Sequence, residues 1–197
     1  MRRISVPVLA LLAVSLLLLP IRVEAFSTGG GYVTVPLDTF LAIARPGDLI
    51  IVRGDAWYMK IAGYWHHVAI YIGNGYVVEA TPDYGVKISH VSTVVSNRLA
   101  VGLFRVKTTD LVRGRAVQFV LAQLGKPYDY GWLLYPGGKQ VYGASYYCSE
   151  LAWASYLAAG GPDIDANPGF TLRYGFNVAP DEIAMDNDVY PVAVWTA

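Results

Sequence analysis

The sequence has little charge, few histidines and a single cysteine. Charged residues make up 15% of its 197 positions, against about 25% in an ordinary globular protein. Because 54% of the residues are apolar, the composition excludes an intrinsically disordered chain. Fifteen Lys and Arg balance fifteen Asp and Glu without a basic block, which excludes a nucleic-acid partner on composition. The length fits one domain, with or without a tail.

The first 25 residues differ from the rest. Arg2 and Arg3 precede an uncharged run over residues 4–21, and Val23-x-Ala25 offers a small-residue exit before Phe26. This pattern is typical of a secretory signal peptide, although the run is also just long enough for an uncleaved membrane anchor. We therefore expect residues 1–25 to be a signal peptide or anchor and residues 26–197 to form one domain. The protein would be secreted or held at the outer face of the membrane.

Cys148 has no second cysteine with which to form an internal disulfide. In an exported protein such a residue pairs with another chain, lies inert in the core, or is a reactive thiol. If Ser145 caps a helix over residues 146–159, Cys148 is its third residue, where free N–H groups and positive potential lower a thiol pKa. A buried structural cysteine is the alternative at this stage.

The pattern of apolar runs and turn residues predicts an α+β fold with an antiparallel sheet, because strands and helices do not alternate regularly. A loop is expected over residues 54–66 and irregular structure over residues 168–187. Strands are predicted over residues 49–53, 67–72, 76–80, 86–88, 101–106 and 189–195, and helices over residues 36–43, 111–124 and 146–159.

A thiol nucleophile needs a base, usually a histidine that a third group orients. The three histidines are His66, His67 and His90. His67 opens an apolar strand, and His66 and His67 point to opposite faces if the strand already runs there. At most one of the two should therefore meet Cys148. His90 has no neighbour that suggests chemistry, and we interpret it as a surface residue.

Glu79 could orient His67, because it lies on the partner strand of a predicted hairpin. A two-residue turn would pair Glu79 with Ile70 and turn it away from His67. A three-residue turn would pair it with Ala69, on the face of His67. Both turn lengths are common, so the pattern alone leaves the position of Glu79 open.

The same polar residues lack the spacing of a metal site. His66, His67, His90, Glu79 and Cys148 form no His-x-x-x-His or Cys-x-x-Cys pair, so we expect no metal and no other cofactor.

Aromatic residues precede both His67 and Cys148, in loops that contain glycine or proline. Core packing is the plain explanation, but the pattern favours a groove wall. The candidates for substrate binding are Tyr64, Trp65, Tyr128 and Tyr147.

Five short segments resemble one family in their order. They are Pro46-Gly47-Asp48-Leu49-Ile50, His67-Val68-Ala69-Ile70-Tyr71-Ile72-Gly73, Val78-Glu79-Ala80, Leu124-Gly125-Lys126-Pro127-Tyr128-Asp129 and Tyr147-Cys148-Ser149-Glu150-Leu151. Together they resemble the circularly permuted branch of the NlpC-type papain-like cysteine hydrolases, the YiiX/YebB-like group, over residues 45–160.

This resemblance implies a permuted papain-like fold in which the helix that bears the cysteine packs on an antiparallel sheet. It implies Cys148 as nucleophile, His67 as base and Glu79 as the residue that orients His67, and hence the three-residue register. One departure is Ala69, where the family usually has glycine.

The resemblance implies an exported cysteine hydrolase that cleaves an amide bond, in a peptide or a cell-wall peptide, or an ester. Family substrates are diverse. Two alternatives remain: a lipid acyltransferase or lipid hydrolase of the lecithin–retinol type acting at a membrane surface, or a non-catalytic binding module on the same fold.

Overall fold

The computed structural model describes residues 31–54, 63–134 and 136–196. The predicted signal peptide or anchor, and most of the predicted loop over residues 54–66, lie outside these ranges. Within them, no helix combines the length and apolar character needed to cross a bilayer.

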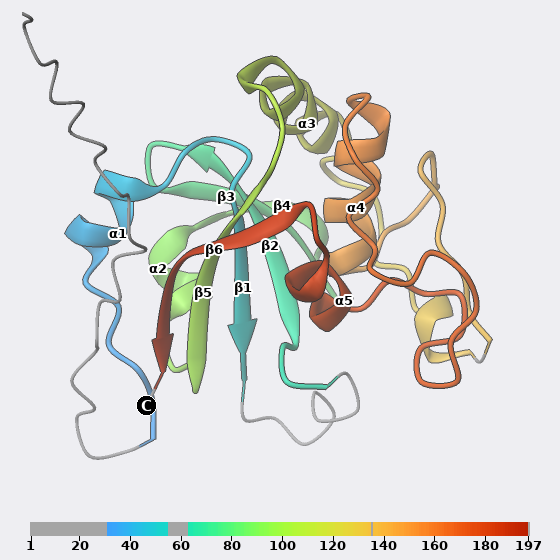
Figure 1. Cartoon of the computed structure of the whole chain (residues 1–197), viewed down its shortest axis with the longest axis horizontal. Coiled ribbons are helices and arrows are strands. Elements are labelled where there is room, and N and C mark those ends of the chain that lie inside the picture. Colours follow the sequence, from blue (N-terminus) through green and yellow to red (C-terminus); the bar gives the residue numbers. More distant parts are fainter. Residues whose placement is uncertain (1–30, 55–62, 135, 197) are drawn as a thin grey trace, which may run out of the picture.

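Six strands form one antiparallel sheet in the order β4-β3-β2-β1-β5-β6 (Figure 1). The strands are β1 Leu49–Arg53, β2 His67–Gly73, β3 Tyr76–Thr81, β4 Gly85–His90, β5 Ala100–Val106 and β6 Val189–Thr196. The helices are α1 Leu37–Ile43, α2 Val91–Val95, α3 Asp110–Ala122, α4 Cys148–Ala158 and α5 Pro180–Met185, with a 3-10 turn η2 at Gly131–Leu133. The predicted α+β class and antiparallel sheet are confirmed.

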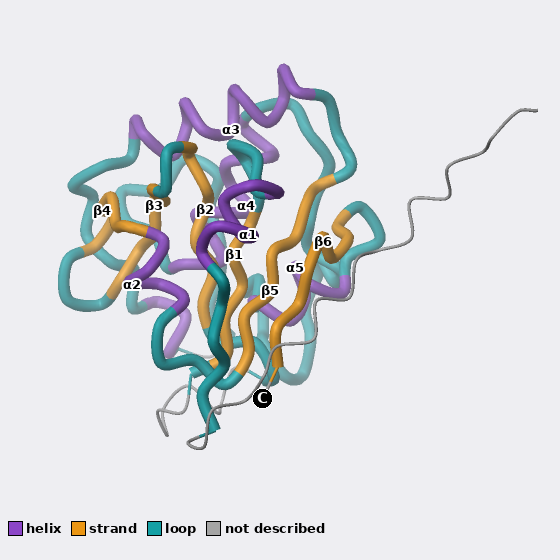
Figure 2. The backbone as a smooth tube through the Cα atoms, turned by 90° about the vertical axis from the view of Figure 1, so that its left-hand side faces the viewer, coloured by secondary structure: helices purple, strands orange, loops and turns teal. Residues whose placement is uncertain are grey.

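Helices cover both faces of the sheet, which explains why its central strands are apolar throughout. Along β1, Leu49 and Ile51 join a core cluster with α3 and α4, whereas Ile50 and Val52 join a second cluster with α1 and α2. In Figure 2, α1 and α2 lie in front of the sheet and α4 lies behind it. Alternate residues of one strand therefore enter two separate cores.

Helix α4 begins later than the sequence pattern predicts. Its N-cap is Tyr147 rather than Ser145, and Cys148 is its first residue rather than its third. The cause is an isolated β-bridge between Tyr146 and Tyr128, in which both backbones are extended. A residue held in such a bridge cannot also start a helix. The bridge brings Tyr128 next to the beginning of α4.

The segment expected to be irregular over residues 168–187 contains helix α5. Pro180 occupies its first position, where the missing N–H costs nothing. The Glu182 side chain accepts a hydrogen bond from the Ala179 N–H at 2.9 Å and so caps the helix start. Both signals are present in the sequence, but the helix has only six residues, which is too short to show a periodic pattern.

A buried ion pair ties the turn before β1 to β5. Arg105 on β5 donates from Nε and Nη2 to the two carboxylate oxygens of Asp48, each at 2.7 Å. Asp48 is fully buried and Arg105 is 9% exposed. Two parallel N–H···O bonds make this the strong form of an ion pair.

We expect Asp48→Asn to lower the free energy of unfolding by about 3–5 kcal/mol, because it leaves the Arg105 guanidinium buried without its anion. Urea unfolding of both proteins measures the difference. Asp110→Asn is the matched control, since its carboxylate pairs with Arg113 but is 91% exposed, and it should leave the urea midpoint unchanged. Equal effects of the two variants would contradict the prediction.

Candidate active site

The thiol of Cys148 lies at the beginning of helix α4, against the first residues of β2. Its side chain is free and the residue is only 7% exposed. The Val68 backbone N–H faces the sulfur and lowers the pKa of the thiol. The first residues of a helix also have N–H groups without intrahelical acceptors, so the thiol lies among donors that favour an anion.

A β-bulge decides where Glu79 lies. The hairpin turn has two residues, Asn74 and Gly75, and not the three that the resemblance implied, but the ladder shifts by one residue between Tyr71 and Gly73. Beyond the bulge Ile70 pairs with Val78, so the next residue, Glu79, lies opposite Ala69. This is the register in which Glu79 shares a sheet face with His67.

Glu79 holds the ring of His67 through a short hydrogen bond. The His67 Nε2 and Glu79 Oε2 atoms are 2.7 Å apart. The other carboxylate oxygen accepts from the Ser89 hydroxyl at 2.6 Å and lies 3.5 Å from the Lys87 ammonium. Burial alone would raise the pKa of Glu79, but these donors and the nearby charges lower it to about 2. Glu79 is therefore ionised across the physiological range.

His67 and Cys148 are buried together, and each shifts the pKa of the other towards its charged form. Burial alone would lower the pKa of His67, but the Cys148 thiolate and Glu79 raise it to about 9. Burial would likewise raise the pKa of Cys148, but the His67 imidazolium and the Val68 N–H lower it below its ordinary value. Because Nε2 faces Glu79, Nδ1 is the ring nitrogen left for the thiol. The arrangement favours thiolate and imidazolium together.

His66 has a different protonation state from His67. The Gly54 N–H donates to its Nδ1 at 3.2 Å, and its Nε2 lies 3.1 Å from the Gly63 carbonyl oxygen. Nδ1 is thus the acceptor and Nε2 carries the proton of a neutral ring. Burial lowers its pKa, in keeping with that assignment. His90 accepts a hydrogen bond from the Ser92 N–H and caps α2 instead.

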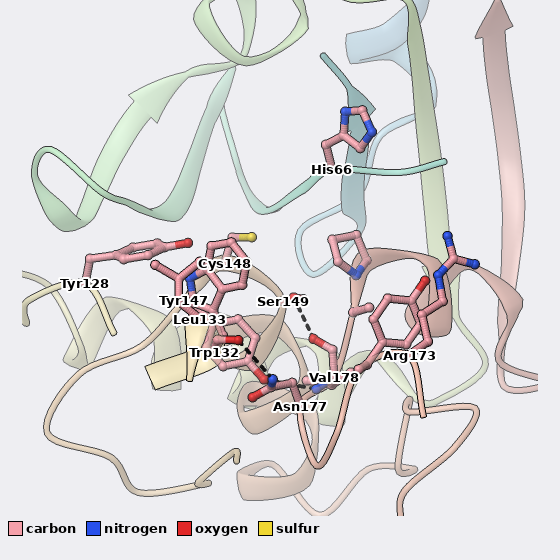
Figure 3. A pocket seen from close by; sticks show the side chains of 13 residues that line it. His66, Tyr128, Trp132, Leu133, Tyr147, Cys148, Ser149, Arg173, Asn177 and Val178 are labelled. Atoms are coloured by element: carbon pink, nitrogen blue, oxygen red, sulfur yellow. Dashed lines mark hydrogen bonds between the residues drawn. The ribbon is translucent and has the colours of Figure 1, made fainter. Parts of the chain in front are cut away.

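A cavity of about 300 Å³ opens beside Cys148 (Figure 3). Figure 3 shows the Tyr128 hydroxyl pointing towards the cysteine from one end of the cavity and Arg173 at the other end. One wall comes from the loop before α4 and the other from the segment around α5. The lining residues are His66, Tyr128, Trp132, Leu133, Tyr147, Cys148, Ser149, Arg173, Tyr174, Asn177, Val178, Ala179 and Pro180.

Two of the four predicted groove residues, Tyr64 and Trp65, are not in this lining. The Trp65 ring packs edge-on against Phe104 in the core, with centroids 5.7 Å apart. The Tyr64 ring lies under the Arg53 guanidinium. Their backbone N–H groups both donate to Asp181. Their nearness to His67 in sequence does not bring their side chains to the thiol.

The sequence pattern did not predict the wall formed by residues 173–180. The Val178 N–H donates to the Tyr147 hydroxyl at 2.9 Å, and the Ser149 hydroxyl donates to the Val178 carbonyl at 2.8 Å. These bonds clamp the wall onto both neighbours of Cys148. Tyr128 and Tyr147, the other two predicted groove residues, do line the cavity. Only the Pro180-Asp181 start of α5 offered a local signal.

The histidine and the cysteine of this site follow an unusual order along the chain. The histidine strand comes first and the cysteine helix follows it, on an antiparallel sheet. This order defines a circularly permuted papain-like fold, and a buried thiolate–imidazolium pair is the chemistry of a cysteine hydrolase. The family model described as permuted papain-like amidase enzyme, YaeF/YiiX, C92 family, matches residues 43–174, about two thirds of the chain. The chain belongs to this family and is an enzyme of the cysteine peptidase and amidase type.

Two individual proteins are similar to the chain. The uncharacterized protein YycO of Bacillus subtilis (strain 168) is 27% identical over 126 residues, which cover 59% of this chain and 48% of YycO. The chain thus spans about half the length of that curated relative. The crystal structure of the metalloprotein yiiX from Escherichia coli O157:H7 superposes with a TM-score of 0.57 at 20% identity, over 75% of this chain and 95% of that one. This second likeness supports the fold.

The structure of yiiX is described as that of a metalloprotein. In residues 31–54, 63–134 and 136–196, no three His, Cys, Asp or Glu side chains gather as a metal ion would require. His67 and Glu79 bind one another, and the ring nitrogens of His66 face the backbone. The described side chains therefore do not fit a resident metal.

We expect the alkylation rate of Cys148 to rise with a midpoint below the value of about 8.5 for an ordinary thiol. His67→Ala should raise that midpoint by removing the cation. Glu79→Gln should raise it less, because glutamine can still accept a hydrogen bond from the ring. Iodoacetamide rates measured against pH provide the comparison.

His90→Asn is the control for this series, because asparagine still caps α2. It should leave the alkylation midpoint of Cys148 where it is. A midpoint near that of a free thiol in the unaltered protein, or one that His67→Ala does not move, would refute the charged pair.

Proposed function

We propose that the protein is an exported cysteine hydrolase that cleaves an amide or ester bond through Cys148, His67 and Glu79. The observation that supports this most directly is the burial of Cys148 and His67 beside a cavity of about 300 Å³, with pKa shifts that favour the thiolate and the imidazolium. Membership of an amidase family favours an amide in a peptide, including a cell-wall peptide.

The reaction has two halves, both of which use His67. The Cys148 thiolate attacks the substrate carbonyl carbon, and the His67 imidazolium gives its proton to the leaving amine or alcohol as that bond breaks. A thioester remains on Cys148. Neutral His67 then takes a proton from water, whose oxygen attacks the thioester and releases the acid. Cys148 leaves as thiolate and His67 keeps the proton, which restores the pair.

Two donors are available for the oxyanion that forms in each half. The Cys148 N–H is the first of helix α4 and has no acceptor within the helix. Burial, together with the Cys148 charge, raises the pKa of Tyr128, so its hydroxyl stays protonated. Donors fixed in place before the reaction are worth more than donors that must reorganise.

The family branch, the export segment and the domain bounds are proposed from the sequence alone. We propose the NlpC-type, YiiX/YebB-like group as the nearest branch, on the His67-to-Gly73 and Tyr147-to-Leu151 segments. We also propose that residues 1–25 direct export or anchor the chain, and that residues 26–197 act as one catalytic domain at the cell exterior.

A second candidate function is acyl transfer from a lipid at a membrane surface. It is favoured by exposed apolar side chains beside the cavity: Leu133, Leu134, Phe170, Leu172 and Phe176. Their two loops are joined by a hydrogen bond from Phe176 N–H to the Pro136 carbonyl at 2.8 Å, and they lie side by side in Figure 1. Exposed Leu and Phe at loop tips suit the boundary of a lipid bilayer.

An activated ester, p-nitrophenyl acetate, tests the proposed chemistry without knowledge of the natural substrate. We expect a burst of nitrophenol, and mass mapping should place one hydroxylamine-sensitive acetyl group on Cys148. Cys148→Ala should abolish both, and His67→Ala should reduce the burst rate by about two to four orders of magnitude. His90→Asn should behave as the unaltered protein.

The fate of the acyl group separates the two candidates. Release as acetate supports a hydrolase, whereas transfer to added glycerol or lysophospholipid vesicles supports an acyltransferase. Alkylation of Cys148 without any acyl-enzyme would contradict both and favour a binding module.

A further inference from the structure

The cavity beside Cys148 has one guanidinium in its wall and no carboxylate. Among its thirteen lining residues Arg173 is the only one with a permanent charge, and none is Asp or Glu. The other described charges close to the thiol cancel in pairs, because the His67 imidazolium faces the Cys148 thiolate and Lys87 lies 3.5 Å from Glu79. Arg173 thus places a positive charge in the cavity wall.

Arg173 differs from Arg105 and Arg113, which are held by carboxylates, in having no anionic partner. Arg105 pairs with Asp48 and Arg113 with Asp110. Across the described ranges, Arg173 forms no ion pair, and its side chain is exposed. A guanidinium without a counterion at a cavity wall is suited to bind an anion from solution, since its planar donors match a carboxylate.

The Arg173 guanidinium is nevertheless held in place by an aromatic ring. Its Cζ atom lies 5.2 Å from the centre of the Tyr174 ring, a cation–π distance. Tyr174 is itself fixed, because its hydroxyl donates to Asp181 at 3.3 Å and its backbone N–H donates to the Thr171 hydroxyl at 2.9 Å. An arginine that rests on a fixed ring loses less conformational entropy when it binds.

Asp181 is the acidic residue that binds Tyr174, the ring under Arg173. Its two oxygens already accept from the Tyr64 N–H, the Trp65 N–H and the Tyr174 hydroxyl. Because three donors occupy it, Asp181 holds the ring under Arg173 rather than competing for the guanidinium.

We propose that Arg173 selects substrates that carry a carboxylate close to the bond that is cleaved. The acceptable substrates would then be acidic amides, such as peptides with a glutamyl or aspartyl residue or a free carboxyl group at the reacting end. Cys148 would act on the carbonyl at one end of the cavity while Arg173 binds the carboxylate at the other end (Figure 3). This assignment rests on the proposed function.

Two alkylating reagents of equal shape test the charge preference. Iodoacetyl-glutamate amide and iodoacetyl-glutamine amide differ by one carboxylate, and in both the Cys148 sulfur displaces iodide to form a thioether. In the unaltered protein we expect the acidic reagent to react about five- to tenfold faster than the neutral one, the gain expected for a half-exposed charged hydrogen bond.

Arg173→Gln should bring the ratio of the two rates close to one, through a slower reaction with the acidic reagent. Arg173→Lys should give an intermediate ratio, because an ammonium retains the charge but not the planar pair of donors. Arg115→Gln is the matched control: it removes an exposed arginine from α3, away from the cavity lining, and should leave the ratio unchanged. Salt near 1 M, where the Debye length is about 3 Å, should also lower the preference.

A binding measurement separates failure of this inference from failure of the proposed function. In Cys148→Ala, N-acetyl-glutamate amide should bind more tightly than N-acetyl-glutamine amide by NMR titration, and Arg173→Gln should remove the difference. Equal reactivity and equal binding of the acidic and neutral compounds would overturn the role of Arg173. An unreactive Cys148 with preserved preference for the acidic ligand would support Arg173 and overturn only the proposed function.

Discussion

A histidine that is both buried and charged sets the requirements for the whole site. Burial lowers the pKa of His67, so the ring keeps its proton only where anions face it on two sides. Cys148 supplies one anion from the start of α4, and Glu79 supplies the other from β3. The start of α4 must therefore meet the β2–β3 hairpin, from which it is distant in sequence, where β2 begins. The rest of the fold can be understood as what holds these three side chains within hydrogen-bonding distance.

The position of α4 is fixed at its start rather than along its length alone. The bridge at Tyr146 stops the helix from beginning earlier. The buried Glu150 side chain accepts from the Tyr147 N–H at 3.2 Å, and burial raises its pKa to about 7. Val178 binds the residues on both sides of Cys148. The contact of Glu150 is a local cap, but the bridge to Tyr128 and the two bonds of Val178 come from other segments, so the sulfur position also depends on tertiary structure.

The strands and the identity of the polar residues could be predicted from the sequence, but their relative placement could not. Continuous apolar runs and an Asn-Gly turn mark β2 and β3 because such signals are local. The register at Glu79 depends on a bulge that no local pattern indicated, and only the family resemblance selected it. The start of α4 depends on the bridge between Tyr128 and Tyr146, which is a long-range contact.

The cavity wall formed by residues 173–180 connects substrate specificity with the reactivity of the Cys148 thiol. The family match ends at residue 174, whereas the wall continues through residues 177–180. Loops around a constant scaffold usually vary with substrate. Here, however, the wall donates to Tyr147 and accepts from Ser149, the two neighbours of Cys148. A change that reshapes this wall must also move the thiol relative to His67. A change of the backbone at Val178 therefore affects substrate choice and thiol reactivity together.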